Sequence, residues 1–207
     1  FVTGSGGLTV SHNITAQGNI AGDNSTNITG IAAITAGSDA TINGVTVGKG
    51  ANSVAANTVL GVTALDANTT GDRNTAIGKD ALGANTTGSK NVAIGENALL
   101  VNTTADDNTA IGVGALDANT TGNNNTALGR NTLTDNTTAS YNTAVGYRAF
   151  YGGSSNGWGN TCVGSEAGYD ISSAWGCTLL GNDCGKNITT GQDNTCVGHN
   201  NSVALTT

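Results

Sequence analysis

Short alternations of polar and apolar residues recur along the chain at a nearly fixed step. The unit Asn-Thr-Ala-Ile-Gly-x-x-Ala-Leu-x-x-Asn-Thr-Thr-Gly is clearest in residues 74–88, and the step is 17 residues except for one step of 18. The glycines that end the first alternating segment repeat with the same spacing: Gly61, Gly78, Gly95, Gly112, Gly129, Gly146, Gly164, Gly181 and Gly198. Such a period is typical of a repeat protein whose units stack on their neighbours.

The length of the unit decides its type of structure. Two-helix repeats need about 33 residues or more, so the shorter unit predicts strands. In residues 74–88 we expect two short strands, 74–78 and 81–85, separated by turns where Gly and Asn adopt positive φ at little cost. The fold class predicted is therefore all-β: a parallel β-roll or β-solenoid made of two-strand coils of about 17 residues.

Stacked coils would place equivalent side chains in columns about 4.8 Å apart. Alternate residues of a strand share a face, so Thr75 and Ile77 are expected on one face and Ala76 on the other. We predict that two columns of large apolar residues form the structural core. The first contains Leu60, Ile77, Ile94, Ile111, Leu128, Val145, Val163, Leu180 and Val197, and the second Leu65, Leu82, Leu99, Leu116, Leu133 and Phe150.

A column of amides accompanies these apolar columns. Its members are Asn68, Asn85, Asn102, Asn119 and Asn136. Stacked asparagines hydrogen-bond side chain to side chain in cross-β structures, so we expect an amide ladder here. Their Asn-x-Thr sequences are interpreted as turn chemistry of the repeat rather than as glycosylation sites.

The repeat divides the chain into three parts. Residues 1–50 do not follow the period and are predicted to form an extended β stalk or connector. Residues 51–145 carry the regular solenoid repeats. Residues 146–207 keep the period but contain all four cysteines and six of the eight aromatic residues, so we expect decorated solenoid coils there.

The composition agrees with a thin, hydrogen-bonded stack. Only 10% of the residues are charged, where about a quarter is usual. Proline, which cannot donate to a β ladder, is absent from the sequence. A net charge of −7 with seven basic residues argues against nucleic-acid binding, and no apolar run is long enough for membrane insertion. Because the sequence contains no methionine, we expect it to be a piece of a longer product.

Two families carry similar motifs. The Asn-Thr-Ala-Ile-Gly-x-x-Ala-Leu unit is similar to the Asn-Ser-Val-Ala-Ile-Gly-x-x-Ser repeat of trimeric autotransporter adhesin heads, which are left-handed parallel β-rolls packed as trimers. The longer form in residues 81–88, together with residues 39–48, resembles tail-fibre proteins of marine bacteriophages, such as cyanophages. The resemblance extends over residues 39–207. It implies an intertwined homotrimeric fibre, often with a C-terminal chaperone segment that is removed by cleavage.

The resemblance also implies a function. We expect a structural fibre or adhesin segment that attaches to a host cell, located in a virion tail fibre or at an extracellular surface. Its expected partners are copies of itself, a host cell-surface glycan or outer-membrane protein, and other virion or fibre proteins.

Two alternatives remain open. One is a tailspike that degrades polysaccharide, for which two carboxylates across a groove would suffice. The other is an ice-binding solenoid, suggested by the column Thr58, Thr75, Thr109, Thr126, Thr143, Thr161, Thr178 and Thr195. Against ice binding, Thr-x-Thr arrays are missing and the threonines share a face with the predicted isoleucine core.

Aromatic residues of the decorated coils are the best candidates for a receptor contact. Trp and Tyr offer a large, rigid contact area at low entropic cost. The candidates are Tyr147, Tyr151, Trp158, Tyr169 and Trp175. The alternative is that these side chains cap the roll or pack between subunits.

Other polar residues do not indicate a site. His12 and His199 lack a partner at metal-ligand spacing, and Glu96 and Glu166 occupy equivalent turns that we interpret as solvated corners. The acidic turn at residues 106–107 lacks the nonapeptide of calcium-binding β-rolls. We predict no catalytic residues, no metal site and no cofactor.

The four cysteines are Cys162, Cys177, Cys184 and Cys196. Cys162 and Cys196 replace alanines of one column two coils apart, about 9.6 Å, which is too far for a disulfide. We predict that the cysteines are small buried apolar fillers. The alternative is a bridge from Cys177 to a neighbouring coil.

Overall fold

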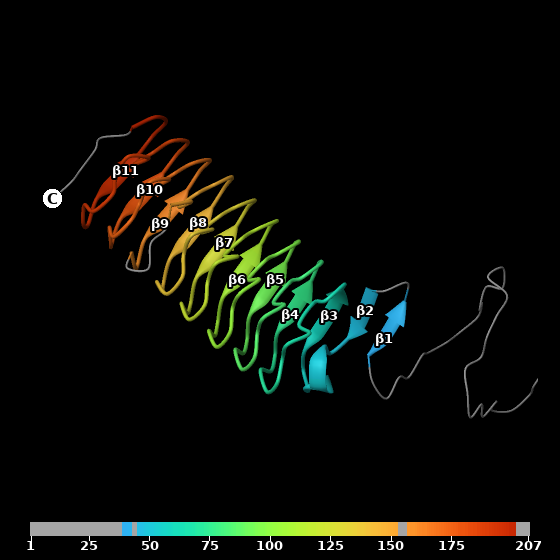
Figure 1. The fold of residues 1–207 in the computed structure, drawn as a ribbon. Coiled ribbons are helices and arrows are strands. Elements are labelled where there is room, and N and C mark those ends of the chain that lie inside the picture. Colours follow the sequence, from blue (N-terminus) through green and yellow to red (C-terminus); the bar gives the residue numbers. More distant parts are fainter. Residues whose placement is uncertain (1–38, 43–44, 153–156, 202–207) are drawn as a thin grey trace, which may run out of the picture. The chain divides into compact units, whose positions relative to one another are not determined.

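The computed structural model describes residues 39–42, 45–152 and 157–201 of the chain. These residues form one sheet of 11 strands in sequence order and a short 3₁₀ helix (Figure 1). The elements are β1 (Ala40–Ile42), β2 (Val45–Gly48), η1 (Ala51–Ser53), β3 (Thr58–Gly61), β4 (Thr75–Ile77), β5 (Val92–Ile94), β6 (Thr109–Ile111), β7 (Thr126–Leu128), β8 (Thr143–Val145), β9 (Thr161–Val163), β10 (Thr178–Leu180) and β11 (Thr195–Val197).

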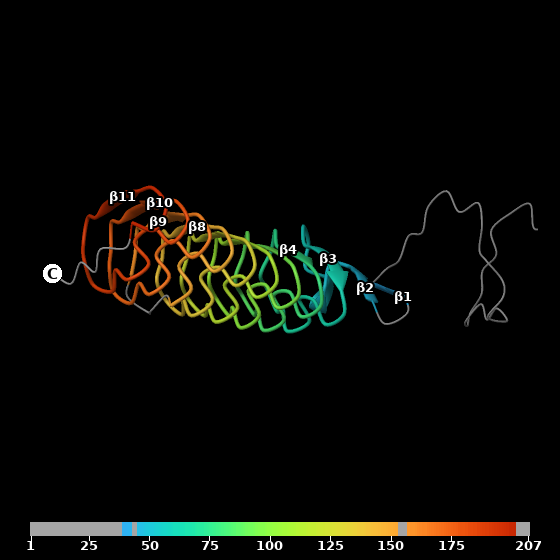
Figure 2. The same ribbon diagram turned by 90° about the horizontal axis from the view of Figure 1, so that it is seen from above.

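From β3 onward, each coil contributes one strand that pairs in parallel with the strand of the next coil. Thr75 pairs with Val92 and Ile77 with Ile94, one repeat further along the chain. The extra residue of the 18-residue step lies outside the strands, so Thr143 still pairs with Thr161. Figure 2 shows the successive coils as stacked closed loops. The prediction of an all-β parallel solenoid with repeats of about 17 residues is confirmed.

The second strand predicted for each coil is not formed. Residues 81–84 lie in a turn, in which Leu82 has a left-handed φ of 52° and Ala81 and Leu82 are both fully buried. Two consecutive inward side chains are incompatible with the alternation of a strand. The turn is still bonded to the next coil, because the Leu82 N–H donates to the Ala98 carbonyl at 3.0 Å. Each coil therefore has one strand and one hydrogen-bonded turn segment.

The core lies on the opposite side of the strands from the one predicted. The alanines in the middle of the strands are fully buried, whereas Leu128 is 44% exposed. The predictions for Leu82, Leu99 and Leu116 are confirmed. Those for Ile77, Ile94, Ile111, Leu128 and Val145 are wrong, because these side chains point outward and are half-buried or exposed. The leucine column occupies much of the interior, and the inward strand residue beside it is small: alanine in β4 to β8 and Val59 in β3.

Two columns of asparagine complete the interior. Asn102 donates from Nδ2 to the Asn85 Oδ1 at 2.9 Å and to the Ala105 carbonyl at 3.2 Å, so the predicted amide ladder is confirmed. In the second column, Asn91 donates from Nδ2 to the same Ala105 carbonyl at 2.7 Å, and its Oδ1 accepts from the Asn108 backbone N–H at 3.0 Å. The two amides thereby fix one corner of the coil.

The first coil is covered by a hairpin. Strand β1 pairs antiparallel with β2, which pairs antiparallel with β3, so the N-terminal edge of the parallel sheet is not open. The Asp39 carboxylate accepts a hydrogen bond from the Lys49 backbone N–H at 2.6 Å. Of the predicted stalk, residues 1–38 lie outside the described residues, and the described part between residues 39 and 50 is folded back as this hairpin.

The last coils exchange their core residues in a coordinated way. Gly168 and Gly185 replace the inward leucine, whereas Ile171 and Ile188 replace the ladder asparagine and are buried. A Cβ atom at Gly185 would lie 2.7 Å from Cδ2 of Leu179, which replaces the small alanine of the strand. Volume removed from one column is thus used by its neighbours, as dense packing requires.

The cysteines have two different roles. Cys162 and Cys177 are free and buried, as predicted for apolar fillers. Cys184 and Cys196 form a disulfide with a Cα–Cα distance of 6.2 Å, so the filler prediction is wrong for this pair and the alternative Cys177 bridge is not formed. The prediction compared cysteines within one column only. The disulfide instead joins Cys184, in the column of Ala81, to Cys196 of the next coil, in the column of Ala76.

Substitution of Gly95 by Ala should destabilise the solenoid. Gly95 has a φ of 137°, and a Cβ atom there would lie 2.5 Å from the Gly112 carbonyl oxygen. Backbone strain alone costs about 1–3 kcal/mol at such positions. We expect a clearly lower urea midpoint by circular dichroism. Gly83→Ala is the control, with its nearest heavy atom 3.3 Å away and Leu100 and Thr134 at the equivalent position. Equal losses would contradict the close approach of the coils.

Substitution of Asn102 by Asp should also destabilise the chain at neutral pH. The change removes the donor of the ladder and buries a carboxylate against the Asn85 Oδ1 and the Ala105 carbonyl. We expect a loss of about 3 kcal/mol in urea unfolding, smaller in acid, where the protonated carboxyl donates. Asn97→Asp is the control, because Asp80 and Asp183 occupy the equivalent position naturally. If the amide ladder contributed nothing to the free energy of unfolding, the two variants would have the same stability.

Candidate functional site

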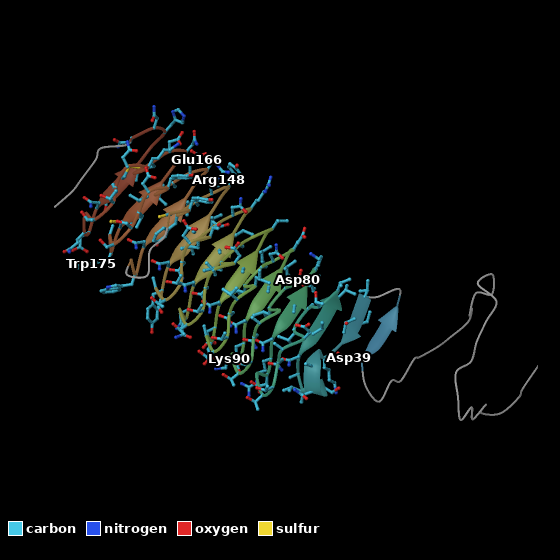
Figure 3. All side chains as sticks on the ribbon, in the orientation of Figure 1. Asp39, Asp80, Lys90, Arg148, Glu166 and Trp175 are labelled. Atoms are coloured by element: carbon cyan, nitrogen blue, oxygen red, sulfur yellow. A yellow bond between two sulfur atoms is a disulfide. The ribbon has the colours of Figure 1, made fainter. Side chains whose placement is uncertain are left out.

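The five predicted contact residues fall into two separate groups. Trp158 and Trp175 precede strands β9 and β10, whereas the tyrosines follow strands β8 and β9 or lie in the turn beyond. In Figure 3, Trp175 lies at one side of the coils and Arg148 at the opposite side. The structure therefore does not bring all five residues together.

The tryptophans form a stacked pair. Their ring centroids are 5.4 Å apart and the rings are parallel. Trp158 is 53% exposed, and its carbonyl accepts a hydrogen bond from the Gly176 N–H at 3.2 Å. Equivalent positions of earlier coils hold Ser89, Asp106 and Asn123. The pair is thus a flat aromatic strip in a column that is polar from Asp72 to Ser140.

The tyrosines belong to a second group, here named the tyrosine–arginine cluster: Tyr147, Arg148, Tyr151, Tyr169 and Lys186. Tyr151 and Tyr169 are stacked with centroids 5.0 Å apart. The Arg148 guanidinium lies 5.1 Å from the Tyr147 centroid and 5.2 Å from that of Tyr151, and Lys186 Nζ lies 5.4 Å from that of Tyr169. These distances are typical of cation–π contacts, which hold the side chains in one arrangement.

Lys186 is neutralised within the protein. It forms an ion pair with Glu166 and a second one with Asp183 at 3.2 Å. The hydrogen bond to Glu166, followed by that to Asp183, raises the pKa of Lys186 above its usual value. Glu166 is therefore a partly buried partner of this lysine rather than the solvated corner that we predicted. Glu96, at the equivalent turn, is exposed, as predicted.

The cations of the cluster were missed by reasoning from the sequence. Lys186 is 17 residues away from Tyr169 along the chain. Arg148 directly follows Tyr147, and the sequence alone does not show that its side chain contacts the rings. The column arrangement contained the signal, since Tyr151, Tyr169 and Lys186 occupy equivalent positions of three successive coils. An aromatic ring beside a cation in one column predicts a cation–π contact.

A third surface runs along the strands. We name it the outer sheet face: the outward columns that begin with Thr58 and Leu60 and end with Thr195 and Val197. All residues of these two columns are threonine or aliphatic, so the face carries no charge. Leu60 is 46% and Val197 65% exposed. An apolar stripe of this length is unusual on a surface that faces water alone.

The remaining polar groups do not assemble into a centre. Within the described ranges, no three His, Cys, Asp or Glu side chains are grouped so as to hold a metal ion. His199 is exposed, and His12 lies outside the described residues. The same ranges contain no helix with the length and apolarity needed to cross a membrane.

No protein-family model, curated protein or solved structure matches the chain.

Proposed function

We propose that the chain is the solenoid segment of a non-catalytic homotrimeric fibre or adhesin that attaches to a host cell surface. The observation that carries the proposal is the outer sheet face, an uncharged apolar stripe that continues over every parallel strand from β3 to β11. The resemblance to phage tail fibres and adhesin heads supplies the expected location, a virion or an extracellular surface.

A second copy of the chain is the partner that fits this stripe best. Successive rungs of a parallel sheet are about 4.8 Å apart. Another copy has the same rung spacing, so its side chains stay in step with this face along the whole solenoid, whereas an unrelated surface goes out of step after a few rungs. Three copies around one axis would each cover an apolar stripe, in line with the closed symmetry of most homo-oligomers.

The aromatic coils are the proposed contact with the host. Regular coils repeat the same short side chains, whereas the coils from Tyr147 to Lys186 add large rings and cations. Trp158 and Tyr147 are among the most exposed large apolar side chains. Trp158 is stacked on Trp175 and Tyr147 contacts Arg148, so these exposed rings lose little entropy on binding, which suits a contact with a glycan or an outer-membrane protein.

One observation favours a second candidate, the ice-binding solenoid. The threonine column does not share its face with the core, because Ile77 and its equivalents point outward beside the threonines. This removes one of the two arguments against ice binding. A thermal-hysteresis assay on the isolated chain tests this candidate, and no observation comparably favours the tailspike.

Charge on the outer sheet face should prevent assembly. Leu128→Lys places an ammonium group in the middle of the stripe, 44% exposed in the single chain. We expect the unmodified chain to sediment as three chains and the variant as fewer, with the circular dichroism spectrum retained because the core is unchanged. Thr87→Lys, at an exposed turn away from the strand, is the matched control. A stable monomer before any substitution would refute the homotrimer.

Removal of the tryptophan strip should weaken attachment. We expect the double variant Trp158→Ala, Trp175→Ala to bind a panel of bacterial strains less than the unmodified chain, because both stacked rings are lost. Binding of the fluorescently labelled protein to cells measures the effect, and thermal unfolding checks the fold. Val101→Ala, an exposed apolar residue of a regular coil, is the control. Unchanged attachment would exclude the strip as the contact.

A further inference from the structure

The Arg148 guanidinium contacts two tyrosine rings. Its guanidinium lies over Tyr147 and Tyr151, and the Tyr151 ring is stacked in turn on Tyr169. All five N–H donors of a guanidinium lie in its plane, and ring contacts do not use them as hydrogen-bond donors. The two ring contacts restrict the guanidinium before any ligand binds.

The Arg148 guanidinium has no anionic partner in the described part of the chain. Buried Nε of Arg148 makes no hydrogen bond, and no carboxylate forms an ion pair with the guanidinium. Glu166 occupies the equivalent position one coil further, but its carboxylate binds Lys186. Asp135 donates its backbone N–H to the Tyr151 carbonyl and forms no ion pair with Arg148.

Four of the six other basic residues form ion pairs, whereas Lys49 and Arg130 form none with a described residue. Arg73, Lys79 and Lys90 each form an ion pair with a carboxylate, as Lys186 does. Arg130 is exposed on the coil before Arg148, and its carbonyl accepts the Arg148 backbone N–H at 3.1 Å. No ion pair of Arg130 is formed with any described residue either. In a chain of net charge −7, Arg130 and Arg148 are joined by a backbone hydrogen bond between neighbouring coils, and neither has a carboxylate partner among the described residues.

We propose that Arg148, assisted by Arg130, is the oxyanion subsite of the attachment surface and that its ligand is an acidic saccharide. A planar guanidinium fork matches the two oxygens of a uronate carboxylate or of a sugar phosphate, and charge-assisted bonds of this kind are stronger than neutral ones. The exposed Tyr147 ring beside it provides an apolar face for the sugar ring. This inference rests on the proposed attachment function and adds the chemical class of the ligand.

The subsite differs in chemistry from the tryptophan strip. Trp175 lies on the other side of the coil from Arg148 (Figure 3). The Trp175 carbonyl accepts the backbone N–H of Asp193, so an acidic residue follows the strip in the next coil. The tryptophan strip, which lies next to an acidic residue, suits uncharged sugar rings. The Arg148 subsite suits anionic sugars. The two surfaces are therefore expected to respond to different saccharides.

Calorimetric titration of the intact chain tests the subsite. The probes are tetragalacturonate, its fully methyl-esterified form and mannose 6-phosphate, each at low and at moderate salt. We expect an oxyanion probe to bind at least about 10-fold more tightly than the neutral ester, with a preference that falls as salt rises. Arg148→Gln should abolish this preference, whereas Arg73→Gln, which alters an arginine already paired with Asp72, should leave it unchanged.

The probes separate the sources of the oxyanion. Binding of tetragalacturonate alone identifies a carboxylated saccharide, and binding of mannose 6-phosphate alone a phosphorylated one. Equal affinity for the acid and the ester, or no binding of either anion, overturns the subsite, and this comparison uses the unmodified chain and does not depend on the folding of a variant. An anion preference that survives in folded Arg148→Gln also overturns it.

Failure of the subsite is distinguishable from failure of the proposed function. A chain that sediments as a trimer and attaches to cells without any anion preference retains the function and loses the subsite. A chain that binds an oxyanion through Arg148 but neither assembles nor attaches retains the subsite and loses the function.

Discussion

The in-register stacking of each coil on the next is the constraint on which the rest of the structure depends. Backbone hydrogen bonds connect successive coils both at the strand and at the turn segment, as from Gly95 N–H to the Ile77 carbonyl at 2.8 Å. Because equivalent residues of successive coils lie over one another, apolar, amide and aromatic side chains are each arranged in columns along the solenoid. The close approach of backbones at the end of each strand excludes a side chain there, which explains why this position is glycine in every coil.

The period, the fold class and the buried leucines could be predicted from the sequence, but the side of the strand that faces inward could not. Alternation shows only that Ala76 and Ile77 point in opposite directions. The choice between them depends on the volume inside the coil, which Leu82 fills because its left-handed backbone turns two consecutive side chains inward. The repeat itself holds a clue, since the column of Ala76 contains mostly small residues while that of Ile77 varies among Val, Ile and Leu.

The candidate site shows the same limit. Read along the chain, the aromatic residues form one segment; arranged in columns, they separate into a tryptophan strip and a tyrosine–arginine cluster. The role of Arg148 in the cluster follows only from its contacts with Tyr147 and Tyr151 in the folded chain. The outer sheet face stays uncharged from β3 to β11, and the exchanged core of the last coils, with Gly168 and Ile171, accompanies a more varied surface elsewhere on these coils. In the function that we propose, the outer sheet face serves assembly and the varied surface of the last coils serves recognition.

Thiol labelling at adjacent strand positions tests this account most directly. Ala93→Cys introduces a residue that the same column already accepts at Cys162, and the native free thiols are buried. We expect a thiol at 93 to react only after unfolding, at any protein concentration. A thiol at 94, from Ile94→Cys, should react readily in dilute protein and become protected as copies associate. Rapid labelling at 93 together with protection at 94 in the dilute monomer would contradict the inward alanine column and the outer sheet face at once.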